Sequence, residues 1–263
     1  MKRFTIGILL YGDYDQLASR CLSSLLSTLS TTSPVADIRI GLNACSDSVK
    51  SIVEEWCALV AVVIAVRIVL YEVHTSPALK YPMMRQMVHD PSDPLADYFM
   101  WFDDDSFLRQ EAGITWWERI ASAMLESELI GEIYTSKMSP GQERWIEQQA
   151  WFNPESTAQP GRRFVFCTGG WFTIRSWVLK RFNYPFPELR HNGGDVLLGE
   201  LVNQQGLRMG NYSVGVEINK EARRGYSETP FADNYRQKGW KPLIPNSTLA
   251  SKRYFQHCSN TNM

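Results

Sequence analysis

Apolar residues in the first hundred positions show two alternating spacings, which together predict a repeated order of strands and helices. Continuous apolar runs predict buried strands at residues 4–10, 38–42, 66–73 and 98–102. Apolar residues at helical intervals predict helices at residues 16–29, 49–60 and 81–89. Strands that alternate with helices are typical of an α/β domain whose sheet is covered on both faces.

The second half of the chain continues this pattern with more irregular connections. Helices are predicted at residues 114–129, 177–182 and 195–205, and strands at residues 132–136, 164–167 and 171–174. Gly169 and Gly170 lie between the last two strands, where they either make a tight hairpin or leave room for a sugar beside the flat face of Trp171. A charged segment at 219–234 is expected to form a loop, either a lid or ordinary surface, and it contains Arg223, Arg224, Gly225 and Tyr226.

Composition narrows the class of protein. A length of 263 residues with a 44% apolar share fits a folded unit rather than a disordered chain. The five cysteines are odd in number and lack CxxC spacing, which disfavours a disulfide framework and a structural zinc site. The longest apolar run, at residues 57–66, is about half as long as a membrane span, and the first residues lack a signal-peptide pattern. We expect a soluble, cytoplasmic protein with no membrane partner.

Charge divides the chain into two parts of opposite sign. Residues 1–160 contain 12 Lys and Arg against 21 Asp and Glu, a net charge of −9, whereas residues 161–263 contain 15 against 7, a net charge of +8. This asymmetry indicates either that one part handles a metal ion and the other an anionic partner, or that charges are spread unevenly over solvated surface.

Three consecutive aspartates, Asp103, Asp104 and Asp105, directly follow the apolar strand at 98–102. The ligand crevice of an open α/β sheet lies at the carboxyl ends of its strands. Adjacent carboxylates repel one another unless a cation compensates them, and Mg²⁺ or Mn²⁺ binds carboxylate oxygens together with substrate phosphate oxygens. On an extended segment Asp103 and Asp105 point to one side and Asp104 to the other. The alternative is an acidic turn or a helix cap.

Several segments together resemble the GT-A glycosyltransferases, and especially their Fringe-like and β1,3-galactosyltransferase-like branch. YFMWFDDDSF resembles the Asp-x-Asp strand of that fold, and FTIGILLYGDYD resembles its first strand and nucleotide-contacting turn. FCTGGWFTIRSWVLKRF is similar to the acceptor-side segment with paired glycines, and GGDVLLGELVNQQGLRM to the acidic segment that opens a late helix. RYFQH is similar to the segment with a late metal-binding histidine.

The resemblance implies the GT-A fold, with a Rossmann-like mixed central sheet flanked by helices, as a single catalytic domain over residues 1–263. Residues 1–110 would bind the nucleotide sugar and residues 111–263 the acceptor. Asp105 would be the principal metal ligand, and Asp103 would contact the metal, the ribose or the donor sugar. His257 would complete the metal site.

The resemblance also implies a general base. Asp195 falls where inverting members place this residue, although the N-cap of a helix explains an aspartate there equally well. Many members of the branch have a second acidic residue where this chain has Gly194, so Glu200 stays an alternative base.

Further polar residues follow the predicted strands and are expected to contact the donor. Tyr11, Asp13, Asn43 and Asp47 could contact its base and ribose, with Asp104 beside them, and Lys80 and Arg85 could reach its phosphate or base. Ordinary loop and helix surface is the alternative for each.

The predicted function is metal-dependent transfer of a sugar, expected to be a UDP-linked hexose, to a hydroxyl acceptor. Inversion at the anomeric carbon is expected, and retention is the alternative. Basic and aromatic residues are interleaved in the second part of the chain, as is typical of nucleic-acid surfaces. The basic ones are Arg162, Arg163, Arg175, Lys180, Arg181, Arg223, Arg224, Arg236, Lys238, Lys241, Lys252 and Arg253. One hypothesis is therefore a 5-hydroxymethylpyrimidine in DNA as acceptor, in a phage-type or bacterial modification. A bacterial glycan acceptor, a non-catalytic nucleotide-sugar-binding module and hydrolysis of the nucleotide sugar are the alternatives.

Overall fold

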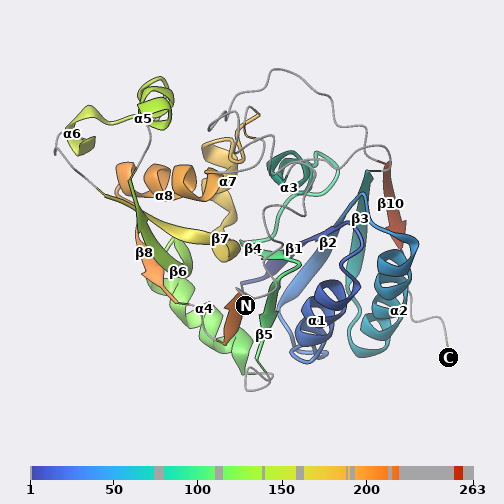
Figure 1. The fold of residues 1–263 in the computed structure, drawn as a ribbon. Helices are drawn as coiled ribbons and strands as arrows, with labels where there is room; N and C mark the ends of the chain where they lie inside the picture. Colours follow the sequence, from blue (N-terminus) through green and yellow to red (C-terminus); the bar gives the residue numbers. More distant parts are fainter. Residues whose placement is uncertain are drawn as a thin grey trace.

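The computed structural model describes the chain over residues 2–73, 80–109, 115–137, 140–157, 163–187, 189, 193–212, 215–218 and 252–256. In chain order (Figure 1) the elements are β1 (Phe4–Tyr11), α1 (Asp15–Leu26), β2 (Val35–Asn43), α2 (Asp47–Val63), β3 (Arg67–Val73), α3 (Lys80–Val88), β4 (Tyr98–Asp103), β5 (Ser106–Leu108), α4 (Trp116–Glu126), β6 (Leu129–Ser136), α5 (Pro140–Glu147), α6 (Pro154–Thr157), β7 (Phe164–Arg175), α7 (Ser176–Arg181), α8 (Gly194–Gln204), β8 (Met209–Asn211), β9 (Val216–Ile218) and β10 (Lys252–Gln256).

The predicted elements are confirmed with one exception. The seven elements predicted in the first hundred residues are present, with ends shifted by at most three residues. The strands predicted at 164–167 and 171–174 are instead one continuous strand, β7, so the hairpin at Gly169 and Gly170 was wrong. Pairing of β7 with β4 on one side and β6 on the other keeps the backbone extended through both glycines.

An eight-stranded sheet forms the centre of the molecule, in the order β10-β3-β2-β1-β4-β7-β6-β8, and β5 pairs with β9 in a separate ribbon. β1 is parallel to β2 and β4, and β2 is parallel to β3. β7 is antiparallel to β4 and β6, and β10 is antiparallel to β3. The sheet is therefore mixed, and its four parallel strands β1 to β4 end at one common edge.

Helices cover both faces of this sheet (Figure 1). The core on one face includes residues of α1, α2 and α4, and the core on the other face includes residues of α3, α7 and α8. Successive side chains of β4 enter the two cores in turn: Met100 and Phe102 enter the first, and Phe99 and Trp101 the second. Because both faces are covered, seven consecutive residues of β1 are buried, which accounts for its uninterrupted apolar pattern.

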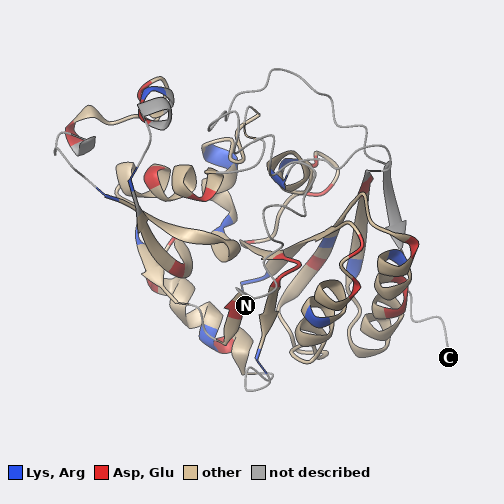
Figure 2. Cartoon of the chain, viewed as in Figure 1, with Lys and Arg blue, Asp and Glu red and all other residues tan. Residues whose placement is uncertain are grey.

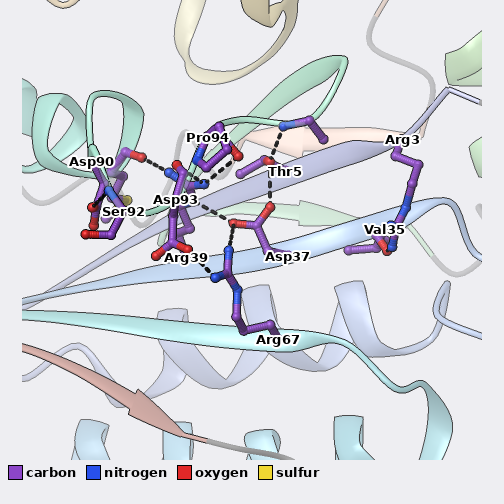
Figure 3. A network of polar contacts seen from close by, with 12 residues as sticks. Arg3, Thr5, Val35, Asp37, Arg39, Arg67, Asp90, Ser92, Asp93 and Pro94 are labelled. Carbon is purple, nitrogen blue, oxygen red and sulfur yellow. Dashed lines mark hydrogen bonds and ion pairs between the residues drawn. The ribbon is translucent and has the colours of Figure 1, made fainter.

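A buried polar network lies near the amino ends of the parallel strands (Figure 3). The Nε atom of Arg39 donates to Asp37 Oδ2 over 2.6 Å, and its guanidinium also donates to the backbone oxygens of Met87 and Asp93. Arg67 forms an ion pair with Asp93. These contacts fasten the connection before β4 to β2 and β3, and so help to fix the direction in which β4 delivers its last residue.

A cavity of about 730 Å³ lies beside this network, at the amino ends of the strands. Several of its charged lining residues are paired with one another, as in the contact of Lys2 Nζ with Asp97 Oδ1 over 3.0 Å. The acidic triplet lies at the opposite edge of the sheet, because Asp103 is the last residue of β4. The site predicted from the sequence is thus separate from this cavity.

Candidate functional site at the carboxyl edge of the sheet

The turns after β1 and β2 are joined at the carboxyl edge of the sheet. Gly12 N donates to Asn43 O over 3.2 Å, and Ser46 N donates to Gly12 O over 2.9 Å. The structure therefore brings together two of the segments from which contacts to the donor were predicted. Asn43 is buried between them, whereas the side chains of Asp13 and Asp47 are exposed. Tyr11, at the end of β1, stacks on Tyr14 with ring centroids 6.3 Å apart.

The acidic triplet forms the end of β4 and the turn that leads into β5. Asp103 and Asp105 are partly exposed, and Asp104 between them is buried. Residues 104 and 105 form a turn and do not continue the extended strand, so the alternation predicted for an extended segment does not apply to Asp105. Asp104 is the buried member of the triplet. Asp103 Oδ1 accepts a hydrogen bond from Trp101 Nε1 over 2.8 Å, which fixes the orientation of that carboxylate.

Lys80, the first residue of α3, reaches this carboxylate. Its Nζ atom lies 2.5 Å from Asp103 Oδ2 and 2.5 Å from the backbone oxygen of Gly169. The rings of Tyr81 and Trp101 flank the ammonium at 5.9 Å and 5.7 Å from its nitrogen to their centroids. The side chain of Lys80 is 12% exposed, so this is a largely enclosed cation that joins β4 to β7.

Asp195 approaches the same point from the first turn of α8. A Cβ atom on Gly169 would lie 3.2 Å from Lys80 Nζ and 3.4 Å from Asp195 Oδ2. The ammonium and the second carboxylate therefore lie against the same face of Gly169. Burial raises the pKa of Asp195 above its ordinary value of 3.8, while Lys80 and the backbone N–H groups of Val196 and Gly169 act against this rise.

The ring of Tyr81 fills the space beside Gly194. A Cβ atom on Gly194 would lie 2.2 Å from Cζ of the Tyr81 ring, so no side chain fits there. Burial comes first among the causes that raise the pKa of Tyr81, followed by the charges of Tyr184, Asp195 and Asp103, so Tyr81 stays protonated. Neither Tyr81 nor Trp101 was expected at the site. Tyr81 reaches it through contacts between residues far apart in the sequence, whereas Trp101 lies two positions before Asp103 in β4, on the same side of the strand, so the alternation of the strand was a signal that could have found it.

Three predicted site residues have other roles in the structure. Trp171 is 1% exposed and packs edge-on against Phe102 in the core, so the prediction of a flat face for a sugar was wrong. Arg85 donates to the backbone oxygens of Asn183 and Pro185 and to the side chain of Asn183, and thus fastens that segment to α3 instead of a phosphate.

Glu200 is the third of these residues. It is fully buried more than one turn beyond Asp195, and its Oε1 atom accepts a hydrogen bond from Gln204 Nε2 over 2.6 Å. Asp195, rather than Glu200, is the carboxylate that the structure brings to Lys80.

The two glycines of β7 have a role in packing. Gly169 makes room for Lys80 and Asp195, and a Cβ atom on Gly170 would lie 3.0 Å from the side chain of Ile218.

Some predicted residues lie outside the part of the chain that the structure describes. They are His257, the predicted lid residues Arg223, Arg224, Gly225 and Tyr226, and the basic residues Arg162, Arg236, Lys238 and Lys241. Within the described ranges, no three His, Cys, Asp or Glu side chains come together in a group that could hold a metal ion. Asp103 and Asp105 are instead two partly exposed acidic residues at one turn. Such a pair fits a Mg²⁺ or Mn²⁺ ion that takes its other ligands from substrate phosphates and water.

The described helices include none with the length and apolar character needed to cross a membrane. Among the described residues, both acidic and basic side chains occur in residues 1–160 and in residues 161–263 (Figure 2). Arg175, which was predicted to belong to a basic surface, donates to the backbone oxygens of Met124 and Ser127 at the end of α4. Its guanidinium therefore has a structural role.

Comparison with known proteins gives matches at the level of structure. No protein-family model matches the chain, and no curated protein matches it. The mannosyltransferase PcManGT from Pyrobaculum calidifontis, solved in complex with GDP-Man and Mn²⁺, is similar over 86% of this chain and 59% of its own, with 13% identity and a TM-score of 0.57. Residues 1–349 of S. aureus TarS are similar over 80% of this chain and 58% of that one, with 14% identity and a TM-score of 0.51.

The same TarS fragment in complex with UDP-GlcNAc is similar over 80% of this chain and 56% of that one, with 13% identity and a TM-score of 0.51. The chain thus spans less than two thirds of the length of these proteins. Identities this low establish similarity of fold and do not distinguish the Fringe-like branch. The predicted fold is confirmed: the chain has the GT-A fold, which it shares with these glycosyltransferases.

Proposed function

We propose that the chain is a glycosyltransferase that moves a sugar from a nucleotide sugar to a hydroxyl acceptor with inversion. The observation that carries this proposal is the meeting of Asp103 and Asp195 at Lys80 and Gly169. One carboxylate comes from the end of β4, where the donor diphosphate is expected, and the other comes from the start of α8 on the acceptor side. An inverting transfer needs these two elements: a place for the leaving diphosphate and a base opposite it.

Asp105 and Asp103 are the residues that would hold a Mn²⁺ or Mg²⁺ ion. When bound, the cation neutralises the negative charge that grows on the diphosphate as the bond to the sugar breaks. The partial exposure of both residues supports this assignment, because an ion shared with a substrate needs access from solvent. His257 could contribute a further ligand.

Asp195 is the proposed general base. The acceptor hydroxyl oxygen forms a bond to the anomeric carbon, the bond from that carbon to the diphosphate oxygen breaks, and the hydroxyl proton passes to the Asp195 carboxylate. Burial raises the pKa of Asp195 and so makes its carboxylate a stronger base than an exposed aspartate. The positive charge of Lys80 lowers the pKa of Asp195 and so favours its ionised carboxylate.

The donor and acceptor are the least defined parts of the proposal. The resemblance in sequence favours a UDP-linked hexose, and the solved neighbours contain GDP-Man in one case and UDP-GlcNAc in another, so both nucleotides belong in a test. Bacterial glycans are the acceptor class to examine first. DNA that contains 5-hydroxymethylpyrimidines is tested in parallel as a second acceptor, in the same assay at cytoplasmic pH.

A donor screen tests the proposal. Melting temperature is measured with UDP-, GDP- and TDP-sugars in the presence and absence of Mn²⁺, for the wild type and for Asp105→Asn. One donor should stabilise the wild type with Mn²⁺, since a ligand at about 100 times its Kd adds about 2.7 kcal/mol. The same donor should lose this effect in Asp105→Asn.

Asp97→Asn is the matched control, because Asp97 pairs with Lys2 at the opposite edge of the sheet. It should respond to donor and Mn²⁺ as the wild type does. Absence of stabilisation by every nucleotide sugar would contradict the proposal. Stabilisation without nucleotide release for any acceptor would favour a non-catalytic binding module.

A further inference from the structure

The ammonium of Lys80 is surrounded by groups that stabilise a positive charge. It is held by a carboxylate oxygen of Asp103 and the carbonyl oxygen of Gly169, both at 2.5 Å, between the rings of Tyr81 and Trp101. Oxygen ligands and aromatic faces are the groups that favour positive charge. The long side chain is also nearly enclosed, so its charge has exchanged water for protein contacts.

Both oxygens of Asp103 are engaged by these neighbours. Oδ2 faces Lys80, and Oδ1 accepts a hydrogen bond from the indole of Trp101. A divalent ion that binds Asp103 would use a remaining lone pair and would lie close to the ammonium. Like charges at such a separation repel strongly where water is largely excluded. Metal and Lys80 therefore compete for the charge of Asp103.

Negative charge is nevertheless concentrated at this turn. The Cys21 Sγ atom of α1 lies 3.8 Å from the backbone oxygen of Asp103, and Asp104 and Asp105 follow directly in the turn between β4 and β5. Lys80 compensates Asp103 through the ion pair between its Nζ atom and Asp103 Oδ2. A nucleotide diphosphate at this edge would add further negative charge and restore the attraction for a divalent ion.

We propose that Lys80 is a resident cation of the acidic turn: it neutralises Asp103 in the nucleotide-free protein and keeps the affinity for divalent metal low, so that metal binds together with the nucleotide diphosphate. This inference rests on the proposed function, since it assumes that Asp103 and Asp105 face the donor diphosphate. It assigns Lys80 the role of a positioning residue that sets the order of binding.

Direct binding of Mn²⁺ tests the inference without any measurement of activity. The concentration of free Mn²⁺ is followed by electron paramagnetic resonance during titration of the wild type and of Lys80→Met, Lys80→Gln and Lys80→Arg. Without nucleotide, the Met and Gln variants should bind Mn²⁺ at least about tenfold more tightly than the wild type, a difference of about 1.4 kcal/mol. Lys80→Arg should bind as weakly as the wild type, because it keeps the charge.

Lys2→Met is the matched control, since Lys2 also pairs with an aspartate, over 3.0 Å, but at the opposite edge of the sheet. It should leave the Mn²⁺ affinity unchanged. A melting curve establishes that each variant is folded, and a folded Gln variant suffices if the Met variant does not fold. Addition of UDP or GDP should raise the Mn²⁺ affinity of the wild type by more than that of Lys80→Met.

Two outcomes would overturn the inference: folded Lys80→Met and Lys80→Gln variants that bind Mn²⁺ no more tightly than the wild type, or a wild type that binds Mn²⁺ equally well with and without nucleotide. Failure of the proposed function differs from both. In that case neither the wild type nor the variants bind Mn²⁺ or a nucleotide sugar under any of these conditions.

Discussion

Replacement of Gly169 by alanine tests whether the close approach of Lys80 and Asp195 matters for sugar transfer. The added methyl group would lie 3.2 Å from the Lys80 nitrogen, which must move by a few tenths of an ångström, and 3.4 Å from an Asp195 oxygen, which is an ordinary van der Waals contact. A displacement of about 1 Å in a reacting group can cost on the order of a hundredfold in rate. We therefore expect kcat/KM to fall by about tenfold to a hundredfold, or about 1.4 to 2.7 kcal/mol in the barrier.

Stability should change little in the same variant. Alanine in a strand is favoured over glycine by roughly 0.5–1 kcal/mol, which offsets the crowding. The melting temperature should stay within about 3 °C of the wild type, because 1 kcal/mol corresponds to about 2–4 °C in a chain of this size. Activity is measured as nucleotide released from the donor identified in the screen, and stability by thermal melting.

Gly210→Ala is the matched control for this experiment. Gly210 lies in β8, the strand at the end of the sheet, and a Cβ atom there would lie 2.8 Å from Ser127 Oγ. The substitution adds comparable crowding far from Asp103, so it should affect the melting temperature and leave kcat/KM unchanged. A Gly169→Ala protein with full activity and an unaltered melting temperature would refute the role given to this contact.

Two further predictions concern Asp195 and its neighbours. Because burial raises the pKa of Asp195 in the folded protein, its ionisation costs stability as the pH rises above about 3.8, and the cost persists at neutral pH. Asp195→Asn should therefore melt at a higher temperature than the wild type at pH 7 but not at pH 3, and the acid limb of wild-type kcat/KM should lie above pH 3.8; an unchanged melting temperature at pH 7 would contradict the burial argument. Gly194→Ala should lose about 1–3 kcal/mol of stability through overpacking against the Tyr81 ring, and Tyr81→Leu in the same chain should recover part of this loss in chemical denaturation; equal stability of Gly194→Ala and the wild type would show that the ring moves freely.

The sequence predicted the features of the site that depend on local pattern. The apolar run of β4 ends in Asp103, and ligands of an open α/β sheet bind at the carboxyl ends of its strands, so the place of this carboxylate could be predicted. Asp195 at the start of a helix was predicted in the same way from the apolar spacing that follows it. Lys80 was expected near phosphate, and the structure places it beside Asp103.

Features that depend on contacts across the sheet could not be predicted. Gly169 and Gly170 have the local signature of a hairpin, yet pairing of Phe102 with Trp171 and of Ile133 with Cys167 holds them in one strand. The same pairing turns Trp171 into the core, although an aromatic residue beside glycines is also typical of a sugar site.

The partners of Lys80 are a further example. It contacts Asp103, 23 positions away, and Gly169, 89 positions away, and neither spacing has a local signature. The ring of Tyr81 fills the space that a side chain at position 194 would need. Only the packing of α3 against α8 and β7 gives the reason for that glycine.

Single-turnover transfer by Asp195→Asn tests the central claim most directly. The donor and acceptor found in the screen are mixed with excess enzyme and Mn²⁺, and nucleotide release is compared for the wild type, Asp195→Asn and Asp97→Asn. The account predicts that Asp195→Asn binds the donor as tightly as the wild type but transfers the sugar about 10²- to 10⁴-fold more slowly, the usual contribution of a general base. Transfer by Asp195→Asn at the wild-type rate would contradict it.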